Sequence, residues 1–92
     1  MTASVFAEVV AALRMVTGED ALWAATIDPA TRLDGDLLLD SIELAALSGL
    51  LRERHGDRVD LAGYVAGLDI DRIIELTVGD VSAYVAAGGQ PR

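Results

Sequence analysis

A serine at the start of an apolar helix is the residue of this sequence best suited to carry chemistry. Ser41 follows an aspartate in the run DLLLDSIEL, residues 36–44. Asp40 and Glu43 have the spacing of a capping box, in which each side chain accepts a hydrogen bond from the other residue's backbone N–H. The Ser41 hydroxyl is therefore free, beside the N–H groups and partial positive charge of a helix N-terminus. This position suits a covalently attached phosphodiester better than a catalytic nucleophile.

A nucleophilic role for Ser41 would require an adjacent general base. The only histidine, His55, follows fourteen residues later on the same predicted helix. The helical rise per residue places it about 21 Å away, which excludes that pair within one chain. We expect His55 to be a C-terminal helix residue, where positive charge suits the dipole. The sequence therefore predicts no catalytic residue and no enzymatic activity.

Four acidic residues crowd around the serine: Asp34, Asp36, Asp40 and Glu43. Their spacing departs from an EF-hand loop, because the third acidic position and the terminal glutamate are missing. We therefore predict no metal site. The cluster is interpreted either as a recognition surface for arginine and lysine on partner enzymes or as solvated loop charge. Both interpretations stay open, and for Asp34 they weigh equally.

The run 40–44, DSIEL, resembles the attachment motif of acyl carrier proteins, in which the serine after an aspartate takes a 4′-phosphopantetheine arm. A second stretch, LTVGDVSAYV at 76–85, resembles the start of that family's last helix, at close to the usual distance from the serine. The resemblance covers about residues 6–87. It implies that a phosphopantetheinyl transferase attaches the arm of coenzyme A to Ser41. The thiol would then carry an acyl or aminoacyl thioester to a loading enzyme, an acyltransferase or a synthase.

The resemblance also implies a docking face for these enzymes along the helix that begins at the serine. Ile42 is expected to be an exposed hydrophobic contact, with burial against the preceding loop as the alternative. The other expected contacts are Asp36, Asp40, Glu43, Ala46, Arg52 and Glu53. The mixed charge of this face differs from the mostly acidic face of fatty-acid carriers. It favours a free-standing carrier of a polyketide or amino-acid-loading pathway.

The segment before the motif departs from the family pattern. Leu38 and Leu39 stand where the family commonly has a glycine followed by a small residue. We expect leucines at these positions to stiffen or bury the segment. Further along, the small residues Ala45, Ala46 and Gly49 either leave space for an attached acyl chain or permit close helix packing, and the sequence does not separate the two.

Length and charge bound the remaining possibilities. The 92 residues predict one small domain, with a folded core at about 5–87 and a flexible tail at 88–92. A chain without cysteine has no disulfide framework. A formal charge of −8 disfavours nucleic acids and anionic membranes as partners. The N-terminus lacks a basic signal-peptide region, and no apolar run can span a bilayer, so we expect a cytoplasmic monomer.

Hydrophobic periodicity predicts an all-α fold, a small helical bundle. The resemblance implies that this is a four-helix bundle of acyl-carrier type with a long first loop and a short third helix. The helices are expected at about 5–17, at 41–55, as a short third helix of Ile70, Ile73 and Ile74 packed on the core, and from 77 onward. The expected buried stripe of the helix at 41–55 is Leu44, Leu47, Ser48 and Leu51, and the expected apolar face of the last helix is Val78, Val81, Tyr84 and Val85. A helical turn after an Asp60 cap is expected within 57–68. In the connection 19–39 the expected core anchors are Leu22, Trp23 and Ile27, and Asp28-Pro29 is expected to open a short helical turn.

A competing hypothesis fits the same apolar stripes and acidic surface. The chain would then be a non-catalytic helical interaction or regulatory module without a prosthetic group, and Ser41 would be incidental.

Overall fold

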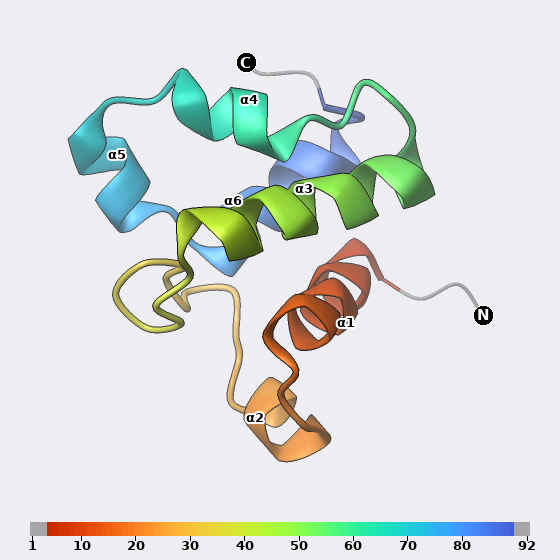
Figure 1. Cartoon of the computed structure of the whole chain (residues 1–92), viewed down its shortest axis with the longest axis vertical. Helices are drawn as coiled ribbons and strands as arrows, with labels where there is room; N and C mark the ends of the chain where they lie inside the picture. The colour runs from red at the N-terminus through yellow and green to blue at the C-terminus, as the bar shows by residue number, and fades with distance from the viewer. Residues whose placement is uncertain (1–3, 90–92) are drawn as a thin grey trace.

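Six helices surround one hydrophobic core in the computed structural model, which describes residues 4–89 (Figure 1). They are α1 (Val5–Thr17), α2 (Ala21–Ala25), α3 (Ser41–His55), α4 (Leu61–Ala66), α5 (Ile70–Glu75) and α6 (Val78–Ala86). Extended pairing within 4–89 is limited to one antiparallel bridge between Arg32 and Thr77. The predicted all-α class is confirmed, with six helical segments where the sequence predicts four helices.

The capping residues fix where the long helices begin. The Ala7 N–H donates to the Ser4 hydroxyl at 3.0 Å before α1. The Glu43 N–H donates to Asp40 Oδ1 at 2.7 Å, and the Asp40 N–H donates to Glu43 Oε1 at 3.1 Å. A second capping box joins Thr77 and Asp80 at the start of α6. These caps satisfy N–H groups that have no partner inside a helix, and the predicted bounds of α1 and α3 are confirmed.

The core lies where α1 packs against α3 and α6. Its fully buried side chains are Val9, Leu13, Leu47, Leu51, Val59, Leu61, Val78 and Val81. Each side chain of this size contributes about 1.5–3 kcal/mol when it is removed from water. The predicted apolar face of α6 is buried in full, and on α3 the predicted stripe is buried except for the half-buried Leu44.

The connection between α1 and α3 differs from the prediction in two respects. Its helix, α2, precedes Asp28-Pro29, which instead forms a turn in which the Asp28 N–H donates to the Thr31 hydroxyl at 2.9 Å. Ile27 is buried and Trp23 packs half-buried against the core, as predicted. Leu22 is 80% exposed, so its predicted role as an anchor is wrong. A five-residue helix turns one side to the core, and Trp23 occupies that side.

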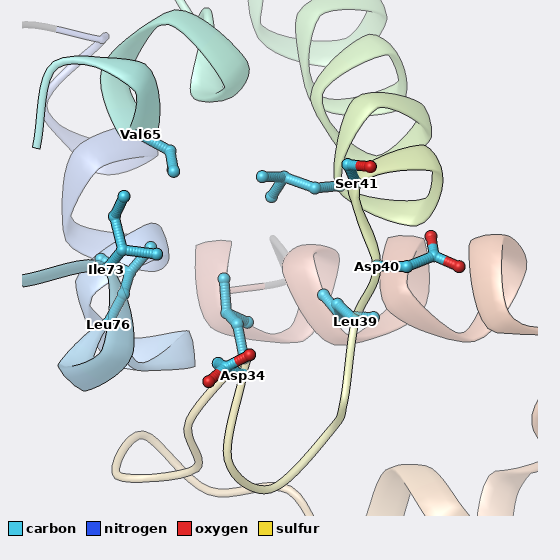
Figure 2. A pocket seen from close by; sticks show the side chains of 9 residues that line it. Asp34, Leu39, Asp40, Ser41, Val65, Ile73 and Leu76 are labelled. Carbon is cyan, nitrogen blue, oxygen red and sulfur yellow. The ribbon is translucent and has the colours of Figure 1, made fainter. Parts of the chain in front are cut away.

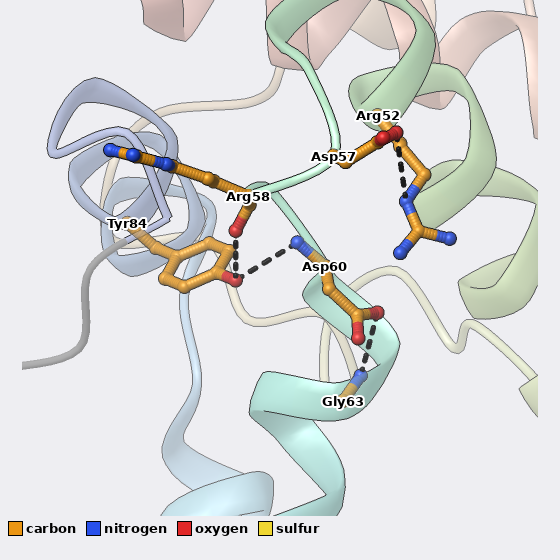
Figure 3. A network of polar contacts seen from close by, with 6 residues as sticks. All are labelled: Arg52, Asp57, Arg58, Asp60, Gly63 and Tyr84. Carbon is orange, nitrogen blue, oxygen red and sulfur yellow. Dashed lines mark hydrogen bonds and ion pairs between the residues drawn. The ribbon is translucent and has the colours of Figure 1, made fainter.

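Helix α4 is tied to α6 and α3 by polar contacts (Figure 3). The Asp60 N–H donates to the Tyr84 hydroxyl at 3.0 Å, and the Gly63 N–H donates to Asp60 Oδ1 at 3.1 Å. The Ala62 N–H donates to the Ser48 hydroxyl at 3.1 Å. The Tyr64 and Tyr84 rings stack with centroids 4.4 Å apart. These contacts stabilise a helix that contains glycine, and the predicted helical turn after the Asp60 cap is confirmed.

Helix α5 contributes less to the core than the sequence predicts. Ile73 packs half-buried against the core, whereas Ile70 is 67% exposed and Ile74 is 44% exposed. Figure 1 shows α5 at the edge of the molecule, where a six-residue helix has a packed neighbour on only part of its surface. The prediction that all three isoleucines pack on the core is therefore wrong for Ile70 and Ile74.

The predicted tail begins with an ordered turn. The Gly88 and Gly89 N–H groups donate to the carbonyls of Val85 and Tyr84 at 2.9 and 3.0 Å. Gly89 has a positive φ of 80°, and a Cβ there would overlap the Arg58 carbonyl. The chain thus approaches Arg58 closely at this point. The rest of the predicted tail, 90–92, lies outside the described residues.

Candidate functional site

Ser41 is the first residue of α3, and its side chain is exposed. The capping box occupies the N–H groups of Asp40 and Glu43. Within residues 4–89 the N–H groups of Ser41 and Ile42 have no acceptor, and the Ser41 hydroxyl has no hydrogen-bond partner. An accessible hydroxyl therefore lies beside two unpaired donors at the positive end of a fifteen-residue helix.

A pocket of about 200 Å³ opens beside Ser41 (Figure 2). Six apolar residues line it. Leu33 and Leu39 come from the loop before α3, Leu44 from α3, Val65 from α4 and Ile73 from α5, and Leu76 directly follows α5. Asp34, Asp40 and Ser41 complete the lining. In Figure 2 the Ser41 hydroxyl and the Asp40 carboxylate point away from Val65 and Ile73. The pocket is thus apolar inside, with polar groups at its edge.

The pocket is not built from the small residues of α3. Ala45, Ala46 and Gly49 are exposed and do not line it. A Cβ built on Gly49 would meet nothing within 4 Å, so this glycine serves no close helix contact either. Neither interpretation of the small residues is therefore supported. The sequence predicts burial at Leu39 and Leu44 but no pocket between them, because Val65, Ile73 and Leu76 reach this place only through the tertiary fold.

Leu38 and Leu39 take different positions before the helix. Leu39 is half-buried and lines the pocket, as burial of this segment predicts. Leu38 is 76% exposed, and its backbone has a positive φ of 55°. Of the two expected effects, burial is therefore wrong for Leu38, and stiffening of the segment stays a prediction. The cause is the backbone conformation, which turns the side chain of Leu38 away from the core.

The predicted docking residues are distributed along the whole of α3 and the preceding loop. Ile42 is 79% exposed, which confirms exposure over burial. The other exposed members are Asp36, Asp40, Ala46, Arg52 and Glu53, while Glu43 is half-buried. Arg52 lies in the last turn, where Nε is 3.9 Å from Asp57 Oδ1 (Figure 3). Arg52 follows Ser41 by eleven positions along the helix, a distance of about 16 Å. Asp40, Ile42 and Glu43 therefore lie beside the serine at the start of α3, Asp36 lies in the preceding loop with its carboxylate on the Arg32 N–H, and Arg52 and Glu53 lie far along the helix.

Negative charge near the serine is not neutralised by ion pairs. Within residues 4–89 the ion pairs join Arg52 to Asp57 and Arg54 to Glu8, and His55 Nε2 lies 3.7 Å from the same Glu8 carboxylate. All of them involve the C-terminal end of α3. The acidic residues around Ser41 therefore have no basic partner in the described part of the chain. No three His, Asp or Glu side chains of residues 4–89 lie close enough together to hold a metal ion.

His55 lies at the end of α3 opposite to Ser41. Its Nε2 atom is buried, makes no hydrogen bond with any described residue, and lies 3.7 Å from Glu8 Oε1 on α1. The two residues connect α1 and α3. Ser41 therefore has no histidine beside it to act as a general base, as the helical spacing predicts.

The chain matches no family model, no curated protein and no solved structure. The helices formed by residues 4–89 are too short or too polar to cross a membrane. The function is therefore inferred from the residues around Ser41 and their geometry.

Proposed function

We propose that this protein is an acyl carrier protein, with 4′-phosphopantetheine attached to Ser41. The observation that carries the proposal is the exposed Ser41 hydroxyl beside two unpaired N–H groups, directly after a capping aspartate. In the attachment step the serine Oγ attacks the phosphorus of the coenzyme A pyrophosphate that bears the pantetheine. The new O–P bond forms as the bond to the nucleotide breaks, and the transferase takes the serine proton. The nucleotide leaves as adenosine 3′,5′-bisphosphate.

The helix terminus favours the product of this step. A phosphodiester on Ser41 carries negative charge close to the free N–H groups of Ser41 and Ile42. A negative group at such a position gains about 0.3–1 kcal/mol from the helix dipole. Because Asp40 and Glu43 hold each other in the capping box, neither needs to rearrange when the arm is attached.

The pocket beside Ser41 fits a carrier of small acyl groups. Its volume, about 200 Å³, is below the range of about 300–1,000 Å³ that is typical of sites for drug-sized ligands. The apolar lining would accept a short hydrocarbon portion of a thioester, while the polar edge stays at the surface. The cargo is therefore proposed to be a short acyl or aminoacyl group.

The partners of this carrier are proposed from its charge. Unpaired carboxylates around Ser41 favour enzymes with basic surfaces: first a phosphopantetheinyl transferase, then a loading enzyme, acyltransferase or synthase. The protein itself would catalyse no step. The mixed charge along α3 supports a free-standing carrier of a polyketide or amino-acid-loading pathway, acting as a cytoplasmic monomer.

The test is covalent modification of the purified protein. Incubation with coenzyme A and a broad-specificity phosphopantetheinyl transferase should add one phosphopantetheine, as measured by intact mass. Ser41→Ala should remove the addition. Ser82→Ala is the matched control, since this serine donates to the Val78 carbonyl within α6 and its loss should leave modification intact. If wild-type protein stays unmodified while a known carrier is converted, the helical interaction module is the remaining function.

A further inference from the structure

Leu38 has a backbone conformation that burial of its side chain does not explain. Within residues 4–89 it is the one non-glycine residue with a positive φ, at 55°. The left-handed region is unfavourable for a side chain with a Cβ, and glycine or asparagine usually takes such positions. The Leu38 side chain is 76% exposed, so it gains little from packing inside this chain. Costly conformations of this kind often occur at functional sites.

The loop around Leu38 is held in place by backbone hydrogen bonds. The Leu38 N–H donates to the Asp34 carbonyl, and the Leu39 N–H donates to the Leu33 carbonyl, both at 3.1 Å. The Leu33 N–H in turn donates to the Leu76 carbonyl at 3.1 Å, which fixes the loop to the segment before α6. The exposed Leu38 side chain is thus presented from an anchored backbone.

Leu38 is close to the proposed attachment atom. Leu38 comes three residues before Ser41, so their Cα atoms lie at most about 11 Å apart. On the other side of the serine, Ile42 is 79% exposed. The exposed carboxylates of Asp34 and Asp36 lie in the same loop and have no basic partner within the described residues. Two exposed apolar side chains that flank Ser41 in the chain, with unpaired carboxylates in the same loop, complement a protein surface that has apolar recesses edged by arginine or lysine.

We propose that Leu38 is a docking residue for the phosphopantetheinyl transferase, and that it acts with Ile42 to seat this enzyme over Ser41. This inference rests on the proposed carrier function. The transferase must bring its active centre to the serine Oγ itself, so it has to approach the surface next to Ser41, where Leu38 and Ile42 flank the serine in the chain. Enzymes that act later react with the thiol at the far end of the arm, so they do not need to approach the serine itself.

The test is the rate of Ser41 modification in Leu38 variants. Leu38→Gly and Leu38→Asn both remove the apolar side chain and suit a positive φ. With a broad-specificity transferase and coenzyme A, each variant should show kcat/KM at least fivefold below wild type. The loss should come from KM, with kcat unchanged, because the side chain contributes binding and no chemistry. Thermal unfolding of both variants checks that the fold is retained.

Leu22→Asn is the matched control. Leu22 is as exposed as Leu38, at 80% against 76%, but it lies on α2, away from the start of α3 (Figure 1). Its substitution should leave kcat/KM within twofold of wild type.

Three results would overturn the inference. If wild type is modified and the Leu38 variants react at the wild-type rate, Leu38 is not a docking residue, although the carrier function stands. If wild type is not modified at all, the carrier function and the inference fail together. If wild type self-associates and Leu38→Asn abolishes the association without slowing modification, a second copy of the chain covers this residue instead.

Discussion

Individual side chains around Ser41 have separate tasks. Asp40 and Glu43 cap α3, Leu39 lines the pocket, and Ile42 stays exposed. The capping roles follow from the sequence, because a capping box depends on a spacing of three residues along one helix. The left-handed backbone conformation of Leu38 does not follow from the sequence, because hydrogen bonds from the Leu38 and Leu39 N–H groups to the carbonyls of Asp34 and Leu33 impose it.

The cap of α3 provides a test at the residue scale. Asp40→Ala should lower the free energy of unfolding by about 1 kcal/mol, because the Glu43 N–H loses its acceptor. Urea denaturation measures the change. Asp34→Ala is the control, since Asp34 is exposed and its carboxylate takes no part in a described hydrogen bond or ion pair. Equal losses in the two variants would show that the cap adds nothing beyond general surface charge.

At the scale of elements, the long helices follow from the sequence and the short ones only in part. Helices α1 and α3 have clear apolar periodicity and local caps, so their bounds are predictable. Helix α2 is missed because five residues are too few to show a period. Helix α4 contains Gly63, and its stability depends on contacts from Ser48 and Tyr84, which are distant in sequence.

Two glycines within helices separate the effect of helix propensity on stability from the effect of packing. Gly49 lies exposed in α3, and a Cβ there would meet nothing within 4 Å. Gly49→Ala should therefore stabilise the protein by up to about 1 kcal/mol. In α6, a Cβ on Gly79 would lie 2.8 Å from the Pro29 carbonyl oxygen. Gly79→Ala should destabilise the protein by about 1–3 kcal/mol through this overlap.

Thermal and urea denaturation of the two glycine variants measure these opposite effects. If both alanines stabilise the protein, the contact between the start of α6 and the turn at Pro29 is looser than the structure shows. If both destabilise it, Gly49 serves a role in α3 that its open surroundings do not reveal.

At the scale of the whole molecule, charge is distributed unevenly along α3, with basic residues at its end and acidic residues at its start. Arg52 and Arg54 pair with acidic groups near the end of the helix, while the start of the helix is acidic and unpaired within the described residues. The net charge of −8 follows from the sequence, but this distribution does not. The pocket is likewise a property of the assembled fold, because Val65, Ile73 and Leu76 approach Leu39 only when the helices pack.

Salt dependence tests the charge distribution. The kcat/KM for modification by a transferase should fall as ionic strength rises, because the screening length shrinks from about 10 Å at 0.1 M to about 3 Å at 1 M. Asp36→Asn should lower kcat/KM at low salt and weaken its dependence on salt. Asp57→Asn is the control, since Asp57 lies beside Arg52 at the far end of α3. Identical salt profiles for all three proteins would contradict steering by the acidic loop.

The half-buried Trp23 on α2 gives the protein a spectroscopic probe. Because the chain has no other tryptophan, indole fluorescence excited selectively would report on the connection between α1 and α3 alone. Far-ultraviolet circular dichroism would report on all helices together. Coincident transitions from the two signals would indicate that this long connection melts with the core as one cooperative unit. An earlier fluorescence transition would mean that the segment leading to the serine loosens first.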